Sequence, residues 1–181
     1  MNAQNSFPQR KRMRLENFDY STPGNYFITV IVQGRLNLFG DVIDGKLLLN
    51  QAGKTIENAL LQITKWYQGV ILTHYVVMPN HIHAILTITN EEKIFLAEIM
   101  RKFKSYSTHQ YIEGIRKEGW MNFNKRLWQH NYYEHIIRNQ RAYDFIACYI
   151  ENNPMKWNKD AINPLHDEDK EEIMKQILQL T

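Results

Sequence analysis

The feature that most constrains the fold is the order in which strand-like and helix-like stretches alternate along the chain. Stretches rich in β-branched and aromatic residues predict strands at 25–33, 69–77, 81–89 and 127–138. Apolar residues spaced three or four apart predict amphipathic helices at 51–68, 91–113 and 140–152. Because strands and helices are mixed and the helices are longer than the loops, this order predicts an α+β sandwich, with helices packed on a central antiparallel sheet.

Three local signals mark where these elements turn or end. Asp44-Gly45 in the middle of residues 38–49 predicts a two-residue hairpin turn. Met78-Pro79-Asn80 predicts a bend or bulge between two strands, because proline disrupts a central ladder. Pro154 is expected to stop the last long helix, since the residue before a proline avoids the α region.

Charge is distributed unevenly, although 22 basic residues against 19 acidic ones do not by themselves predict a nucleic-acid binder. Residues 1–20 form a polar, basic arm that is either a solvated tail or a strap for phosphates, with Arg12 and Arg14 as candidate contacts. Residues 158–181 form a polar tail with a short amphipathic helix, for packing or for a dimer contact. Residues 21–157 are therefore expected to form one domain.

The chain shows no sign of secretion or of membrane insertion. Cys148 is the single cysteine, which excludes an intrachain disulfide and a Cys-rich zinc site. No apolar run approaches about 18 residues, and the first residues lack the apolar core of a signal peptide. We therefore expect a cytoplasmic protein with no membrane partner.

His81 and His83 are the first candidates for a functional site. Because side chains alternate along a strand, both imidazoles project from one face while Ile82 points to the other. About 7 Å apart along the strand, they can converge on one divalent ion. Two ordinary histidines on a sheet face are the alternative. Their place at the start of a strand favours a metal site, because the strand holds ligands rigidly.

Tyr149 and Asn153 are the second candidates. Four residues apart on a helix, they share a face, so the amide oxygen could add a third metal ligand while the phenol faces the same cavity. Core packing is the alternative, because Ala142, Phe145, Ile146 and Tyr149 form a stripe of helical period.

Four runs make the chain similar to a known family. YVVMPNHIHAILTI, KFKS, LWQHNYYEHIIR and YIENNPMKW follow one another in this order. Together they resemble the single-tyrosine transposases of the HUH endonuclease superfamily, and most of all the REP-associated tyrosine transposases. The resemblance runs from about residue 24 to residue 157. HUH denotes two histidines that flank a hydrophobic residue, here His81, Ile82 and His83.

The resemblance implies a ferredoxin-like fold, also described as RRM-like, with a catalytic domain at residues 21–157. It implies Mg²⁺ or Mn²⁺ at His81 and His83, and Tyr149 as nucleophile. Related insertion-sequence transposases carry a glutamine ligand four residues after the tyrosine; Asn153 stands there, shorter by one methylene. The implied activity is metal-dependent cleavage and strand transfer of single-stranded, hairpin-bearing DNA through a 5′-phosphotyrosine.

Other roles are less determined by the residues. A homodimer stays open, and it would decide whether Tyr149 meets the histidines of its own chain. Glu134 and His135 are candidates for the general base. Candidate DNA contacts, with a solvated helix face or core packing as the alternatives, are Arg101, Lys102 and Lys104 for phosphates and Trp128, Tyr132 or Tyr133 for bases.

Three rival functions remain at this point. An RRM-like sheet could bind single-stranded RNA or DNA without cutting it, which would require exposed aromatic residues on the sheet. The chain could also be a regulatory descendant of a transposase that has lost catalysis. A metal phosphodiesterase that uses water would tolerate the loss of Tyr149.

Overall fold

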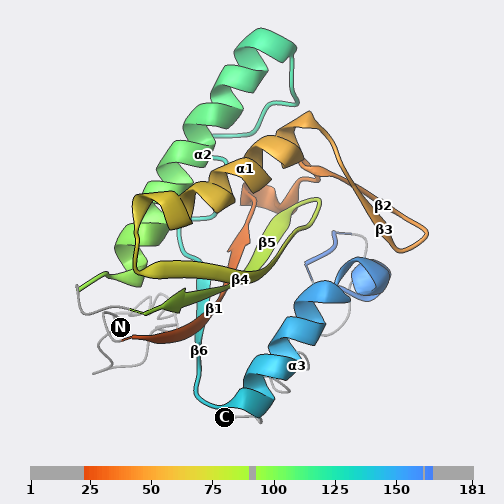
Figure 1. The fold of residues 1–181 in the computed structure, drawn as a ribbon. Coiled ribbons are helices and arrows are strands. Elements are labelled where there is room, and N and C mark those ends of the chain that lie inside the picture. The colour runs from red at the N-terminus through yellow and green to blue at the C-terminus, as the bar shows by residue number, and fades with distance from the viewer. Residues whose placement is uncertain (1–22, 90–92, 161, 165–181) are drawn as a thin grey trace, which may run out of the picture.

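A computed structural model describes residues 23–89, 93–160 and 162–164. Four strands form one antiparallel sheet in the order β4-β5-β1-β6. In that order they span Val70–Val77, His81–Ile88, Gly24–Ile31 and Tyr133–Ile137. Helices α1 (Gln51–Trp66) and α2 (Leu96–Glu118) cover one face, and α3 (Gln140–Glu151) covers the other (Figure 1). The element order β1-α1-β4-β5-α2-β6 is that of a ferredoxin-like fold, which confirms the predicted α+β architecture.

The expected hairpin is inserted between β1 and α1. Strands β2 (Gly40–Ile43) and β3 (Lys46–Leu49) pair with each other in a separate two-stranded sheet. Asp44 and Gly45 join them with φ values of 50° and 71°. Positive φ at both central residues is what a type I′ turn requires, and this explains the Asp-Gly pair.

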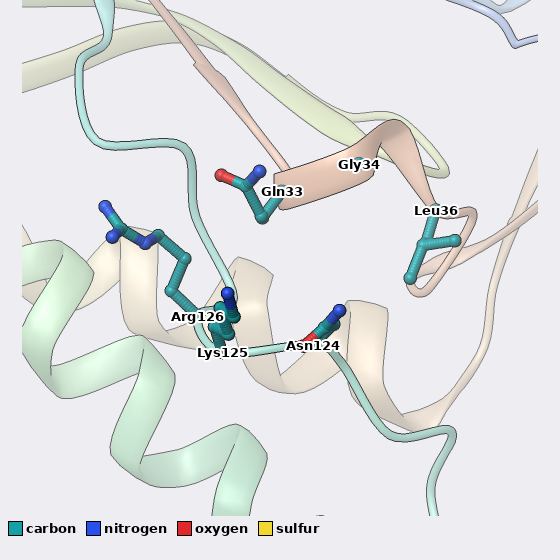
Figure 2. Close-up of a pocket in the computed structure, with 6 residues that line it drawn as sticks. All are labelled: Gln33, Gly34, Leu36, Asn124, Lys125 and Arg126. Atoms are coloured by element: carbon teal, nitrogen blue, oxygen red, sulfur yellow. The ribbon is translucent and has the colours of Figure 1, made fainter.

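A short 3₁₀ turn, η1 (Gln33–Arg35), follows β1 and changes the direction of the chain. It lies across from residues 124–126 of the loop that precedes β6 (Figure 2). The backbone N–H of Gln33 donates to the carbonyl of Leu127 at 2.8 Å, and Val32 forms an isolated bridge with Trp128. The end of β1 is thus fastened to this loop.

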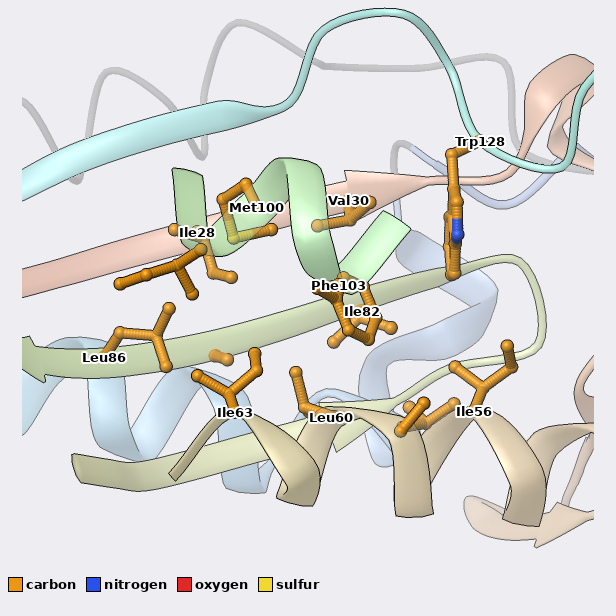
Figure 3. Packing of buried hydrophobic residues seen from close by; sticks show 14 of the residues in the cluster. Ile28, Val30, Ile56, Leu60, Ile63, Ile82, Leu86, Met100, Phe103 and Trp128 are labelled. Atoms are coloured by element: carbon orange, nitrogen blue, oxygen red, sulfur yellow. The ribbon is translucent and has the colours of Figure 1, made fainter. Parts of the chain in front are cut away.

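The larger core lies between the sheet and the helices α1 and α2. Side chains of both strands and both helices pack there (Figure 3): Ile28 of β1, Ile82 and Leu86 of β5, Ile56, Leu60 and Ile63 of α1, and Met100 and Phe103 of α2. Because side chains alternate along β5, burying Ile82 and Leu86 on this face turns the odd-numbered residues toward α3. A smaller cluster around Phe27, Ile85 and Ile146 fills the α3 face. The two histidines of β5 therefore face α3.

Two predicted elements have different bounds in the structure. Helix α2 begins after Phe95 and ends at Gly119, whose φ of 69° gives the left-handed conformation that glycine adopts readily. In the first six residues of the strand predicted over 127–138, Trp128 forms only an isolated bridge with Val32, and β6 begins at Tyr133. Lys104 explains the difference: its Nζ donates to the carbonyls of residues 129, 130 and 131 at 2.9, 3.2 and 3.1 Å.

The chain continues in a folded form after α3. Helix α3 ends at Glu151, close to the predicted end, but the expected reason is wrong, because Asn153, directly before Pro154, has α-helical dihedral angles. Pro154 stands at the first position of a second 3₁₀ helix, η2 (Pro154–Lys159), where its missing N–H costs nothing. Asp160 and Asn163 are both buried, with 4% and 3% of their surface exposed. The basic arm with Arg12 and Arg14 and the short amphipathic helix predicted in the C-terminal tail lie outside the described residues. No helix in the described part of the chain has the length and apolar character needed to cross a membrane.

Candidate active site

His81 and His83 meet on the face of β5 that α3 covers. Both side chains are buried, with 0% and 2% of their surface exposed. Their Nε2 atoms are 3.0 Å apart, and the ring of His81 stacks on Trp157 of η2 with a centroid distance of 6.1 Å. Burial lowers the pKa of His83 to about 3 and holds the pKa of His81 well below its usual value. Both imidazoles are therefore neutral, the form that binds metal ions.

The orientation of His81 is set by Asn80, which is fully buried. The Asn80 amide nitrogen donates to the carbonyls of Arg35 and Ile162, both at 3.1 Å. Its Oδ1 must then be the acceptor in the 2.8 Å bond to His81 Nδ1. A neutral His81 that donates from Nδ1 keeps the lone pair of Nε2 pointing into the site.

His83 is held by residues of the neighbouring strand. Its Nδ1 lies 2.8 Å from the hydroxyl of Thr29, directly across from it in β1. The ring stacks on Phe27 at a centroid distance of 5.4 Å and an interplanar angle of 26°. Because a hydroxyl can donate or accept, Thr29 is compatible with either tautomer of His83.

Tyr149 reaches the histidine pair from α3. Its hydroxyl lies 3.2 Å from His83 Nε2, and its ring meets Phe27 edge-on. The start of α3 is fixed by Asn139, whose side chain accepts from the N–H of Ala142 at 2.8 Å, and this sets which residues face the sheet. The ring of Tyr149 therefore packs in the core, as its place in the apolar stripe suggested, while its hydroxyl contacts the histidine pair.

The surroundings of Tyr149 keep its phenol protonated. Burial raises the pKa of Tyr149 most, and the nearby carboxylate of Asp160 raises it further. A hydrogen bond from Asn153 works in the opposite direction and lowers this pKa. Asn153 lies just beyond the end of α3 with α-helical dihedral angles, so it still lies beside Tyr149. Its Oδ1 is buried and has no hydrogen-bond partner among the described residues.

Asp160 is a site residue that the sequence analysis missed. Its carboxylate lies 3.6 Å from His81 Nε2, and its other oxygen accepts from the N–H of Ile162 at 2.8 Å. Asn163 braces the same segment by donating to the carbonyl of Trp157 at 2.9 Å. The expected domain ended at residue 157, three residues too early to include this carboxylate. The available signal was Pro154, which can begin a new helical turn as well as end the previous one.

The donor set fits a divalent cation. Ligand atoms of His81, His83 and Asp160 all lie within 4.8 Å of one another, and all three residues are buried. The amide oxygen of Asn153 is buried and is available as a further oxygen donor. Imidazoles with carboxylate and amide oxygens suit zinc as well as Mg²⁺ or Mn²⁺, and the oxygens favour the harder ions.

The candidate DNA contacts do not gather around this site. Arg101 is exposed and pairs with Glu98, while Lys102 lies over the rings of Trp66 and Tyr67. The donors of Lys104 are taken up by the three carbonyls described above. Trp128 is 3% exposed, and its Nε1 donates to Ser107, so its ring packs in the core and is covered.

The two candidate bases lie on opposite faces of the sheet. Glu134 pairs with Ile28, whose side chain belongs to the α1 and α2 core, so it points away from Tyr149. His135 pairs with Phe27 and shares the face of Tyr149. Tyr133 also lies on that face, where it contacts Phe27 edge-on, and Tyr132 lies under the Lys104 ammonium.

The chain is similar to known proteins over most of its length. The family model described as "Transposase IS200 like" matches residues 44–153. An uncharacterized protein of Haemophilus influenzae is 32% identical over 84% of this chain and 92% of the relative. A REP-associated tyrosine transposase of Escherichia coli K12 is 27% identical over 78% of this chain and 74% of its own.

The fold also matches a solved structure. The structure of a REP-associated tyrosine transposase bound to a REP hairpin superposes with a TM-score of 0.58 at 24% sequence identity. The match covers 79% of this chain and 74% of that one. At this identity the likeness establishes the shared ferredoxin-like architecture.

Proposed function

Because the chain belongs to the IS200-like transposase family, we propose that it cuts and rejoins single-stranded DNA through a covalent link to Tyr149. The observation that carries this proposal is the 3.2 Å contact between the Tyr149 hydroxyl and His83 Nε2. It brings a candidate nucleophile to the edge of a buried cluster of metal-ligand side chains, although 66 residues separate the two along the chain. The same Nε2 atom lies 3.0 Å from His81 Nε2, so the hydroxyl of Tyr149 is directed at the histidine pair itself.

Mg²⁺ or Mn²⁺ would be held by His81, His83 and Asp160, with Asn153 as a further candidate. When bound, such an ion would neutralise negative charge on the scissile phosphate. Asn80 and Thr29 would keep the two imidazoles directed at it. Asp160 would also lower the cost of burying a divalent charge, because a carboxylate offsets one of its two charges.

In the proposed step, the Tyr149 oxygen bonds to phosphorus and the bond from phosphorus to the 3′ oxygen breaks. The products are a 5′-phosphotyrosine and a free 3′-hydroxyl, and the phenol proton balances the charge on the leaving oxygen. Attack by another 3′-hydroxyl reverses the step and joins strands. The raised pKa of Tyr149 keeps the nucleophile neutral in the empty site, and the hydrogen bond from Asn153 favours the phenolate once the proton is lost.

We further propose that the substrate carries a hairpin. A solved protein with the same fold is a REP-associated tyrosine transposase bound to a REP hairpin. The curated relative from Escherichia coli is also named a REP-associated tyrosine transposase. A hairpin would present its unpaired flank to the partly buried hydroxyl of Tyr149.

The test uses end-labelled hairpin DNA with an unpaired flank, incubated with the protein and Mn²⁺. We expect a protein–DNA adduct that survives denaturation. Its slower migration in a gel should disappear after protease treatment. Tyr149→Phe should abolish the adduct, whereas Tyr143→Phe, on the same helix but in contact with His74, should retain it. An adduct that persists in Tyr149→Phe refutes this nucleophile, and cleavage with no adduct in the wild type supports a water-dependent phosphodiesterase instead.

The alternative of an RRM-like binding module gains no support from a specific observation. Such a module stacks bases on exposed aromatic residues of its sheet. In this protein Tyr26 and Phe27 of the central strand β1 are each 1% exposed, because helices cover both faces of the sheet. Any single-stranded nucleic acid must therefore approach at an edge or an end of the sheet.

A further inference from the structure

A polar cavity lies beyond the end of β1, apart from the histidine cluster. It has a volume of about 460 Å³, and its walls are the turn after β1 and the loop before β6 (Figure 2). The turn contributes Gln33, Gly34 and Leu36, and the loop contributes Asn124, Lys125 and Arg126. A second cavity of about the same volume shares Lys125 and Arg126 and continues along the loop toward His130. No acidic residue lines either cavity.

The backbone of this cavity is held in an unfavourable conformation. Lys125 has a φ of 63°, and the N–H of Arg126 donates across it to the carbonyl of Asn124 at 2.7 Å. A three-residue turn of this kind is rare and strained for a residue with a side chain. Among the described residues only Arg35, Asp44 and Lys125 combine a side chain with a positive φ. The hairpin turn explains Asp44. Lys125 lines the cavity, and Arg35 lies in the turn between two residues that line it, Gly34 and Leu36.

Such strain persists where the surrounding structure enforces it, and it is concentrated at functional sites. Here the enforcement is visible on both walls. Lys104 fixes the loop through three carbonyls, and the backbone N–H of Gln33 donates to Leu127, the residue that follows Arg126. The result is a rigid loop that presents two cations side by side, Lys125 and Arg126, both with exposed side chains.

The cavity is linked directly to the histidine pair. Ile31, the last residue of β1, pairs with His81, and Gln33 follows two residues later, about 7 Å along the chain. Asn80 contacts both regions: its side chain binds His81 and the carbonyl of Arg35, and its carbonyl accepts from Val32 at 2.8 Å. The cavity and the histidine pair therefore lie at the same end of strands β1 and β5.

We propose that this cavity binds the unpaired DNA that flanks the scissile phosphate, and that it reads one base there. This inference rests on the proposed function. Lys125 and Arg126 contact phosphates, and the amides of Gln33 and Asn124 contact the base. An amide side chain offers a donor and an acceptor together, which is the pattern that base edges present. A volume of 460 Å³ lies within the usual range of small-ligand pockets, enough for one unstacked base.

The test measures equilibrium binding of fluorescein-labelled hairpin DNA by anisotropy, in the full chain carrying Tyr149→Phe so that no adduct forms. Arg126→Ala and Lys125→Asn each remove one cation, and asparagine tolerates the left-handed backbone at residue 125. We expect each to weaken binding by about fivefold to tenfold, and to reduce the slope of log affinity against log salt by about 0.7. Lys65→Ala, an equal charge change at the far, exposed end of α1, should stay within about twofold.

Base reading is tested with four hairpins that differ at one flanking position. Gln33→Ala should reduce the largest affinity ratio among them by about fivefold or more. If the variants at residues 33, 125 and 126 all bind like Lys65→Ala, the cavity is not a DNA subsite. That result leaves the proposed function intact, provided that Tyr149 still forms its adduct. Conversely, a wild-type protein that binds DNA here but never forms an adduct refutes the catalytic proposal alone.

Discussion

Asn80 is the residue whose replacement tests the site most directly. One buried amide makes three hydrogen bonds: two from its nitrogen to the carbonyls of Arg35 and Ile162, and one to its oxygen from His81. Asn80→Ala removes all three and leaves a buried imidazole N–H and two carbonyls without this partner. Asn80→Asp preserves the volume and the acceptor for His81 but removes both donors. The pair of variants therefore separates the orientation of His81 from the fastening of the two segments.

The expected magnitudes follow from these contacts. Leaving a buried polar group unsatisfied costs about 1–3 kcal/mol, so Asn80→Ala should lower the free energy of unfolding by about 3 kcal/mol or more. Loss of an outer-shell partner of a ligating histidine typically lowers metal affinity about 10-fold to 100-fold. Asn80→Asp should lose comparable stability, because its carboxylate faces two carbonyl oxygens, yet it should bind Mn²⁺ within about threefold of the wild type.

Three measurements check this reasoning. Urea denaturation with a chelator gives stability, calorimetric titration with Mn²⁺ gives affinity, and ¹⁵N NMR of the metal-free protein identifies which nitrogen of His81 carries the proton. We expect Nδ1–H in the wild type and in Asn80→Asp, and a mixture of tautomers in Asn80→Ala. If Asn80→Ala binds Mn²⁺ as tightly as the wild type and keeps Nδ1–H, Asn80 does not position His81.

Three other predictions follow from single contacts. Burial lowers the pKa of His83 from its usual 6.5 to about 3, so between these pH values the unfolded chain binds more protons than the folded one. The free energy of unfolding is therefore full well above pH 6.5 and should fall by about 2 kcal/mol at pH 5. Urea denaturation with a chelator measures this, and a free energy that does not change with pH would contradict it. Asp160→Asn should weaken Mn²⁺ binding by about tenfold or more, whereas unchanged affinity in the same titration would remove Asp160 from the ligand set. Lys104→Met should lower the unfolding free energy by about 2–4 kcal/mol, since three carbonyls lose a charged donor, and a thermal midpoint equal to the wild type would show that water replaces it.

Elements with a strong local pattern were predicted well. The period-two alternation of residues 81–89 correctly placed Ile82 in one core and both histidines on the opposite face. The Asp44-Gly45 pair correctly predicted the hairpin, because only a turn with two positive φ values needs those residues. The strand predicted from residue 127 is interrupted before Tyr133 for the opposite reason. Its apolar and aromatic residues satisfy a β pattern, but Lys104, distant in sequence, takes the carbonyls that a ladder would use.

The histidine pair, the tyrosine and the four runs that carry the family resemblance were all present in the amino-acid sequence, because each motif consists of residues a few positions apart. Asp160, the burial of Trp128 and the cavity beside Lys125 depend on contacts between segments tens of residues apart, so no local period reveals them. The same holds for the 3.2 Å approach of Tyr149 to His83. It exists because α3 packs on the face of the sheet toward which the two histidines of β5 project. Alternation along one strand decides which side chains share a face, but only the packing of the layers decides what they meet there.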